Sequence, residues 1–184
     1  HIAELIPGTE VPAAFSKTPR VVRLKMRDVS GAVPYGADWF LDTGTRHLVH
    51  FVDNVVDYDV TGEGRRLRHD PRFAPQGVNV NFVQVNVPGQ EITVRTFEKG
   101  VEDETLACGT GIVASSLATW LATRLAARQS TRCDDLGSCQ ITVHARISDL
   151  SVTFTPSLHP DPSASRFTDI WLQGPAAFIC RVEI

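Results

Sequence analysis

Residues 98–118, EKGVEDETLACGTGIVASSLA, decide how the rest of the chain is arranged. Acidic residues come first, Cys108 follows, and the Gly-Thr-Gly at 109–111 opens a run without charge before Arg124. A segment that is apolar all round is typical of a helix enclosed by protein. We therefore predict a buried helix over residues 111–126, with the thiol of Cys108 at its start.

The position of Cys108 at a loop-to-helix junction has chemical consequences. Free backbone N–H groups and the helix dipole favour an anion there, so we expect the thiol to lose its proton more easily. Gly109 and Gly111 are expected to let a substrate carboxylate approach the backbone. The alternative is a small buried Cys beside an ordinary turn. A phosphate-binding loop is disfavoured, because no Lys-Ser/Thr pair follows the glycines.

Composition narrows the class of protein. The 184 residues are 42% hydrophobic and carry a net charge of −3, which suits a globular fold with a substantial core. The sequence has no basic run that favours nucleic acid and no apolar stretch long enough for a membrane span. Residues 1–15 lack a signal-peptide pattern, which predicts a cytoplasmic protein.

The four cysteines, at 108, 133, 139 and 180, lack the spacing of a zinc site, so no metal is expected. Cys133 and Cys139 could pair under oxidation, but two reduced thiols are the simpler interpretation. Cys180 lies in an alternating segment and is most simply a core residue.

The hydrophobic pattern predicts many strands and two helices. A short helix is expected at 62–69, capped by Thr61. Strands are expected at 2–6, 21–26, 39–41, 48–52, 77–87, 92–97, 141–147, 150–154, 169–173 and 177–184. The predicted fold class is α+β, with a curved mixed sheet wrapped around the central buried helix, because that helix has no polar face.

Four stretches resemble one known family. VRTFEKGVEDETLACGTGIVAS (94–115) is similar to the second active-site motif of the diaminopimelate epimerases, and GVNVNFV (77–83) resembles the Asn-bearing strand ahead of it. DTGTRHLVHFVDNV (42–55) resembles the segment around the family's Asn-Pro-His, and IWLQGPA (170–176) its closing strand. The resemblance runs from residue 21 to the end.

The resemblance implies a fold and an activity. Family members have two similar half-domains, each a sheet around a helix, with the active site between them. One cysteine from each half removes or returns the α-proton, which interconverts L,L- and meso-diaminopimelate in lysine and peptidoglycan precursor synthesis. The resemblance therefore implies an isomerase without pyridoxal phosphate or any other cofactor.

The resemblance also assigns roles residue by residue. Cys108 corresponds to the second catalytic cysteine, and Glu98 and His47 help to orient and tune the site. The substrate-binding residues implied are Asn79, Lys99, Gly109, Thr110 and Thr45. Thr45 and Lys99 depart from the family pattern, which has Asn and Arg there, and Lys cannot make Arg's two-pronged contact with a carboxylate.

The first-cysteine motif, Met-Cys-Gly-Asn-Gly, is absent from the sequence. We expect residues 1–29 to be the trailing part of an N-terminal half-domain, 30–174 the domain that bears Cys108, and 175–184 a closing strand. The chain, which begins with His1, is then expected to be part of a longer protein and incomplete alone. Its expected partners are diaminopimelate, the missing half-domain with the second cysteine, and a second copy in a homodimer.

Two alternatives stay open at this point. The chain could be another racemase of the same fold, of the proline or hydroxyproline type, although a different run before the cysteine is expected there. It could also be an inactive fragment or binding module, since the first cysteine is missing.

Overall fold

The structure is a computed structural model that describes residues 3–5, 20–127 and 137–176. Its described part is α+β, with one twelve-stranded mixed sheet and two α-helices. The strands are β1 (Ala3–Leu5), β2 (Arg20–Lys25), β3 (Val29–Ser30), β4 (Val33–Tyr35), β5 (Asp38–Asp42), β6 (Arg46–Phe51), β7 (Asn79–Val87), β8 (Glu91–Glu98), β9 (Asp103–Thr105), β10 (Cys139–His144), β11 (Asp149–Ser157) and β12 (Arg166–Ala176).

The sheet order explains how distant segments meet. Its main path runs β1-β2-β12-β11-β10-β8-β7-β6-β5-β4, while β3 pairs with β12 and β9 with β8. The pairs β6–β7 and β8–β10 are parallel, and the other pairs are antiparallel. The parallel β6–β7 pair places His47 directly opposite Asn79, which brings two of the predicted site residues together.

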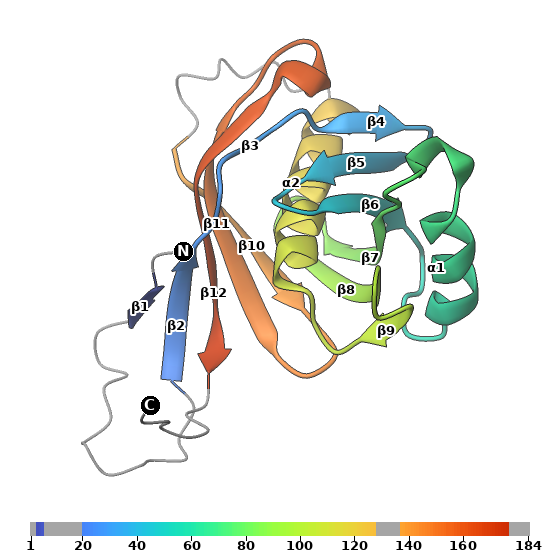
Figure 1. Cartoon of the computed structure of the whole chain (residues 1–184). Coiled ribbons are helices and arrows are strands. Elements are labelled where there is room, and N and C mark those ends of the chain that lie inside the picture. Colours follow the sequence, from blue (N-terminus) through green and yellow to red (C-terminus); the bar gives the residue numbers. More distant parts are fainter. Residues whose placement is uncertain (1–2, 6–19, 128–136, 177–184) are drawn as a thin grey trace, which may run out of the picture.

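Helix α2 (Gly109–Ala126) lies at the centre of the sheet's curve. Figure 1 shows β4–β8 on one side of the helix and the long strands β10–β12 on the other. Residues 111–121 are all buried, so no face of the helix in that stretch meets solvent. The prediction of a curved mixed sheet around a buried helix is therefore confirmed, and the helix begins two residues earlier than expected.

Helix α1 (Val60–Arg68) also lies where the sequence predicted a short helix, but its cap was wrongly assigned. The side chain of Asp59 accepts a hydrogen bond from the backbone N–H of Gly62 at 2.9 Å. Thr61 is inside the first turn, and its hydroxyl donates to Asp103 at 3.1 Å. A carboxylate at the helix start also interacts favourably with the dipole, which explains why Asp59 takes the cap.

Helix α1 packs on the outer face of the sheet and forms a second core with β6, β7 and β8. Gly64 allows this contact, because a Cβ there would lie 2.4 Å from Cβ of Phe97. The buried apolar residues of this second core are Leu48, Val55, Val60, Leu67, Phe73, Val78, Val80, Phe82 and Phe97. The described residues also include two short 3₁₀ helices, η1 (Pro71–Phe73) and η3 (Pro162–Ala164).

Short strands account for most other differences from the sequence prediction. The sequence predicted no strand between residues 26 and 39, yet β3 and β4 lie there, because neighbouring strands pair with two or three residues of each. The predicted strand at 177–184, with Cys180, and Cys133 lie outside the described residues. The division into 1–29, 30–174 and 175–184 stays a prediction, and β12 passes the 174/175 boundary while it pairs with β2.

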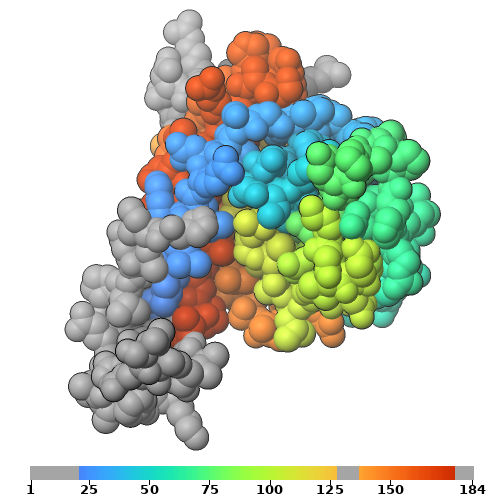
Figure 2. All heavy atoms as spheres, in the orientation of Figure 1, coloured from blue at the N-terminus to red at the C-terminus, as the bar shows by residue number. Residues whose placement is uncertain are grey.

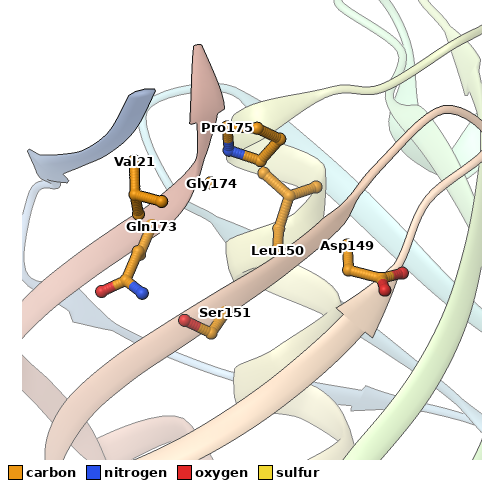
Figure 3. A pocket seen from close by; sticks show the side chains of 7 residues that line it. All are labelled: Val21, Asp149, Leu150, Ser151, Gln173, Gly174 and Pro175. Carbon is orange, nitrogen blue, oxygen red and sulfur yellow. The ribbon is translucent and has the colours of Figure 1, made fainter. Parts of the chain in front are cut away.

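A shallow pocket of ≈ 250 Å³ lies between β2, β11 and β12. Figure 3 shows Leu150 beside Gly174 and Pro175 at this pocket, with Val21 on the neighbouring strand. Gly174 makes room for that packing, because a Cβ there would lie 2.4 Å from Cδ2 of Leu150. None of the predicted site residues lines this pocket.

Candidate active site

Cys108 is the N-cap residue of α2, with extended backbone angles (φ −125°, ψ 106°). Its side chain makes no capping hydrogen bond, so the sulfur is not used to hold the helix end. The residue is buried, with 8% of its surface exposed. The segment that leads into it, coloured yellow-green around residue 100, lies at the molecular surface in Figure 2. Leu106 and Ala107 just before Cys108 are exposed, and Gly109 and Thr110 after it are half-buried, so Cys108 lies close to the molecular surface.

Burial, the largest cause, raises the pKa of the Cys108 thiol, which contradicts the expectation of an easily deprotonated group. The Thr110 hydroxyl and the nearby backbone N–H groups of Gly111 and Thr110 lower the pKa but do not outweigh burial. The charge of Glu98 raises the pKa further. At neutral pH, Cys108 is thus a protonated thiol in this structure.

His47 connects Cys108 to the neighbouring strands through two hydroxyl groups. Its Nε2 atom lies 2.8 Å from Oγ1 of Thr45 and 3.0 Å from Oγ1 of Thr110. Those two hydroxyl oxygens are 3.1 Å apart, and Thr110 Oγ1 is 3.6 Å from Sγ of Cys108. The predicted residues His47, Thr45, Thr110 and Cys108 therefore form one connected cluster.

His47 is fully buried, and burial is the main reason why its pKa falls to about 4. Asp42 raises the pKa and Lys99 lowers it, both less strongly than burial. The imidazole is consequently neutral at physiological pH, with one ring nitrogen that donates and one that accepts.

Asn79 joins the same cluster from β7. Its Nδ2 donates to Thr45 Oγ1 at 3.4 Å, and its Oδ1 accepts the backbone N–H of Lys99 at 2.8 Å. Asn79 therefore fixes the chain just after β8. The charge of Lys99 acts on His47, so its side chain contributes to the electrostatics of the site.

Glu98 and Gly109 lie next to the cluster. Glu98 is the last residue of β8 and acts on Cys108 through its charge. Gly109 begins α2, and a Cβ there would lie 3.2 Å from Cδ2 of Leu172 on β12. All eight predicted site residues thus lie at the start of α2, in the strand ends around it or in the adjoining turns, while their roles stay predictions.

Sequence reasoning missed three polar residues of the site, which are Thr43, Asn81 and Thr96. Thr43 donates through Oγ1 to the carbonyl oxygen of Thr110 at 2.9 Å. Asn81 contacts Nδ1 of His47 at 3.1 Å and accepts from Thr96 at 3.0 Å. The alternation of GVNVNFV could have identified Asn81, because residues two apart on a strand share a face.

The second glycine of the Gly-Thr-Gly sequence has a different role from the one expected. A Cβ on Gly111 would lie 2.2 Å from Oδ1 of Asn81. The space beside Gly111 is therefore filled by the Asn81 amide, and a substrate carboxylate cannot approach the backbone on that side. Gly111 permits close packing between α2 and β7.

Among the described residues, no three His, Cys, Asp or Glu side chains are grouped so that they could hold a metal ion. No described helix is long and apolar enough to cross a membrane.

The chain has a mixed sheet wrapped around a buried helix, with a thiol at the start of that helix and a neutral His beside it. These features define a class of proteins that carry a cysteine where the central helix begins. The family model described as diaminopimelate epimerase matches residues 39–153, and the chain belongs to that family.

Individual relatives agree with this assignment. The chain is 35% identical over 164 residues to the diaminopimelate epimerase of Flavobacterium psychrophilum. The aligned residues make up 89% of the chain and 57% of that relative. It is 48% identical over 115 residues to the diaminopimelate epimerase of Chlorobaculum tepidum, and the aligned residues make up 60% of the chain and 44% of that relative. The chain thus spans about half the length of these relatives.

Proposed function

We propose that this protein is an isomerase that interconverts L,L- and meso-diaminopimelate, and that Cys108 is one of two cysteines that transfer the α-proton. The observation that carries the proposal is the buried thiol at the start of α2, connected through Thr110 to the neutral His47. Family membership and the printed names of the relatives support the substrate.

The proposed reaction moves one proton off the α-carbon and another onto its opposite face. A thiolate takes the α-hydrogen as a proton, and the electron pair of the C–H bond stays on the carbon as a carbanion. A thiol on the other face then donates its proton to that carbon and becomes a thiolate. Two groups with similar acidity make the inversion reversible, and no cofactor takes part in this scheme.

The raised pKa of Cys108 favours one of the two roles for the resting protein. A thiol that holds its proton at neutral pH is ready to act as the acid. The opposing cysteine would then begin as the thiolate base. In the reverse direction Cys108, now a thiolate, would take the proton, aided by the hydroxyl of Thr110 at 3.6 Å.

The substrate carboxylate is proposed to lie at the start of α2. Backbone N–H groups at a helix N-terminus stabilise the negative charge that develops during proton removal. Gly109 and Thr110 supply such groups, and the exposed hydroxyl of Thr45 and the amide of Asn79 are beside them. Lys99 is proposed as a counter-charge for a carboxylate.

The opposing cysteine cannot be Cys139. The side chains of Trp120 and Arg124, near the far end of α2, act on the thiol of that residue, so it lies beside them. Trp120 is twelve residues from Cys108, which is about 18 Å along a helix. Cys108 and Cys139 are the free cysteines among the described residues. We therefore propose that the second cysteine comes from an N-terminal half-domain, as the predicted domain division implies. A cytoplasmic location, the biosynthetic role and a homodimer are parts of the same proposal.

Protection of Cys108 from alkylation tests the substrate. The chain is treated with iodoacetamide at one pH, with or without L,L-diaminopimelate, and the Cys108 and Cys139 peptides are quantified by mass spectrometry. Diaminopimelate should slow labelling of Cys108 and leave Cys139 unchanged, and lysine, which lacks the second carboxylate, should protect less. Equal labelling with and without diaminopimelate contradicts the proposed substrate.

Deuterium exchange tests the mechanism. In D₂O, any incorporation of deuterium at the α-carbon of diaminopimelate should disappear in Cys108→Ala, whose folding is checked by circular dichroism. Complete inversion of L,L-diaminopimelate by these 184 residues alone would contradict the scheme with two cysteines.

A further inference from the structure

The amide of Asn81 is held in one orientation by its neighbours. Its Nδ2 lies 3.2 Å from the carbonyl oxygen of Leu48, which can only accept a hydrogen bond. Its Oδ1 lies 3.0 Å from Oγ1 of Thr96, which donates. Both contacts are buried and both agree, so the nitrogen and oxygen of this amide are assigned by chemistry.

This orientation determines which nitrogen of His47 carries the proton. Nδ2 of Asn81 also lies 3.1 Å from Nδ1 of His47, so Nδ1 must accept and bears no hydrogen. The imidazole is neutral at physiological pH and therefore carries its single hydrogen on Nε2.

The tautomer in turn sets the direction of the hydroxyl hydrogens. Nε2–H donates to the oxygens of Thr45 and Thr110, at 2.8 and 3.0 Å. Thr45 also receives Nδ2–H of Asn79, so its own hydrogen points to Thr110 at 3.1 Å. Thr110 then accepts twice, and its hydrogen is free to point to Sγ of Cys108 at 3.6 Å.

We propose that Asn81 is a positioning residue, which fixes His47 as the Nε2–H tautomer and so directs the hydroxyl hydrogen of Thr110 toward the sulfur of Cys108. With the other tautomer, the bare Nε2 would accept that hydrogen and the sulfur would lose it. Asn81 acts through His47.

The packing around Gly111 supports this assignment independently. Asn81 Oδ1 occupies the space where a Cβ of residue 111 would lie, at 2.2 Å. Asn81 is fully buried and cannot turn away without displacing α2 or Thr96. The glycine that follows Thr110 in the Gly-Thr-Gly sequence thus admits the residue that orients Thr110.

The effect on proton transfer rests on the proposed function, whereas the tautomer itself does not. A hydrogen bond to a thiolate stabilises the charged form. Asn81 would therefore help Cys108 to accept a proton in the direction in which it is the base.

Nitrogen NMR on the full chain, with ¹⁵N-labelled histidine, reads the tautomer directly. Two-bond ¹H–¹⁵N correlations distinguish a protonated from a bare ring nitrogen, and His47→Gln identifies the His47 signals among the six histidines. Wild-type His47 should show a bare Nδ1 and a protonated Nε2. A protonated Nδ1 in the wild-type protein overturns the proposal without any variant.

Asn81→Asp is the matched test, because the carboxylate has the same shape but can only accept. It should convert His47 to the form with a protonated Nδ1. Thr96→Val is the control: it removes a hydrogen bond to the same amide, yet Leu48 still holds Nδ2, so the tautomer should not change. A tautomer change in Thr96→Val, or none in folded Asn81→Asp, contradicts the proposal.

Alkylation of Cys108 reads the consequence for the sulfur, and it needs no epimerase activity. The rate with iodoacetamide at one pH should fall about threefold to tenfold in Asn81→Asp. The charge of the new carboxylate would also raise the pKa of Cys108, as the charge of Glu98 does in the wild type, and so would add to this fall. The effect of Asn81→Asp is therefore measured a second time in a protein that already carries Thr110→Val. There the effect of Asn81→Asp should shrink, because the hydroxyl is already gone; an undiminished effect overturns the relay through Thr110.

The outcomes separate this inference from the proposed function. A bare Nδ1 with no protection of Cys108 by diaminopimelate keeps the inference about the tautomer and contradicts the proposed substrate. A protonated Nδ1 of His47 with full protection of Cys108 by diaminopimelate contradicts the inference about the tautomer and keeps the proposed substrate.

Discussion

Replacement of Gly111 by Ala tests how tightly α2 and β7 are packed at the site. In most helix interiors this change is favourable by about 1 kcal/mol, because Ala has the higher helix propensity. Here the new Cβ would lie 2.2 Å from Oδ1 of Asn81, and real Cβ atoms do not approach an oxygen that closely. Asn81 must move, or the helix must shift away from the strand.

The cost follows from what Asn81 would lose. Its amide makes three buried hydrogen bonds, with Thr96, with the Leu48 carbonyl and with His47. At about 1 kcal/mol each, their loss costs about 3 kcal/mol. The propensity gain offsets about 1 kcal/mol of this. We therefore expect Gly111→Ala to destabilise the protein by about 2 kcal/mol.

Urea unfolding, followed by circular dichroism at pH 7, measures this difference. With a denaturant slope of about 2 kcal/mol per M, the midpoint should fall by about 1 M. Gly109→Ala is the matched control from the same sequence motif. Its Cβ would meet only the far end of the Leu172 side chain, at 3.2 Å, which can move by a few tenths of an ångström. Its midpoint should change little.

The comparison of the two glycines decides the matter. If Gly111→Ala unfolds at the same urea concentration as Gly109→Ala, or at a higher one, the packing of Asn81 against α2 is wrong. Asn81 would then not be held rigidly in the protein.

Three further predictions concern the core, the pH dependence of stability and the hydrogen bonds of Arg95. Ala114→Glu places an unpaired charge in the middle of α2 and should abolish cooperative unfolding, whereas Ala126→Glu, at the exposed helix end, should fold normally. In the unfolded chain His47 binds a proton below pH 6.5, whereas the buried side chain binds one only near pH 4. The free energy of unfolding, measured with urea, should therefore be full above pH 6.5 and fall by about 3 kcal/mol toward pH 4. The variant His47→Asn should not show this loss. Arg95 donates two hydrogen bonds to the carboxylate of Glu104 and also donates to three backbone carbonyl oxygens. The variant Arg95→Lys should therefore lower the free energy of unfolding by about 2 kcal/mol in the same assay. The control Arg66→Lys, on the exposed face of α1, should leave the urea midpoint unchanged.

The central helix could be predicted from the sequence because its evidence is local and long. Eleven consecutive buried residues of α2 contain no charge, and only an enclosed helix fits such a run. The short strands β3, β4 and β9 could not be predicted in the same way. Each has two or three residues and exists because a neighbouring strand offers hydrogen bonds to it, which is information that lies elsewhere in the chain.

The predicted site shows the same division between local and distant causes. Cys108, Gly109 and Thr110 stand together in the sequence, and the resemblance to the family identified His47 and Asn79 beside them. The acidity of Cys108 was predicted in the wrong direction, because the helix start lowers a thiol pKa while burial by distant strands raises it more. A local pattern shows that a helix begins at the cysteine, but it does not show how deeply that end is covered.

Asn81 illustrates what the sequence contained but could not rank. Asn79 and Asn81 lie two residues apart on one face of β7, and nothing in the alternation distinguishes them. The parallel pairing with β6 does, because it sets Asn79 opposite His47 and Asn81 one step deeper, opposite Val49. The shallower amide therefore reaches the exposed Thr45, while the deeper one reaches the inner nitrogen of the imidazole. We propose that one of these two identical side chains faces the substrate and that the other orients the imidazole behind it, and the register of a single strand pair makes the difference.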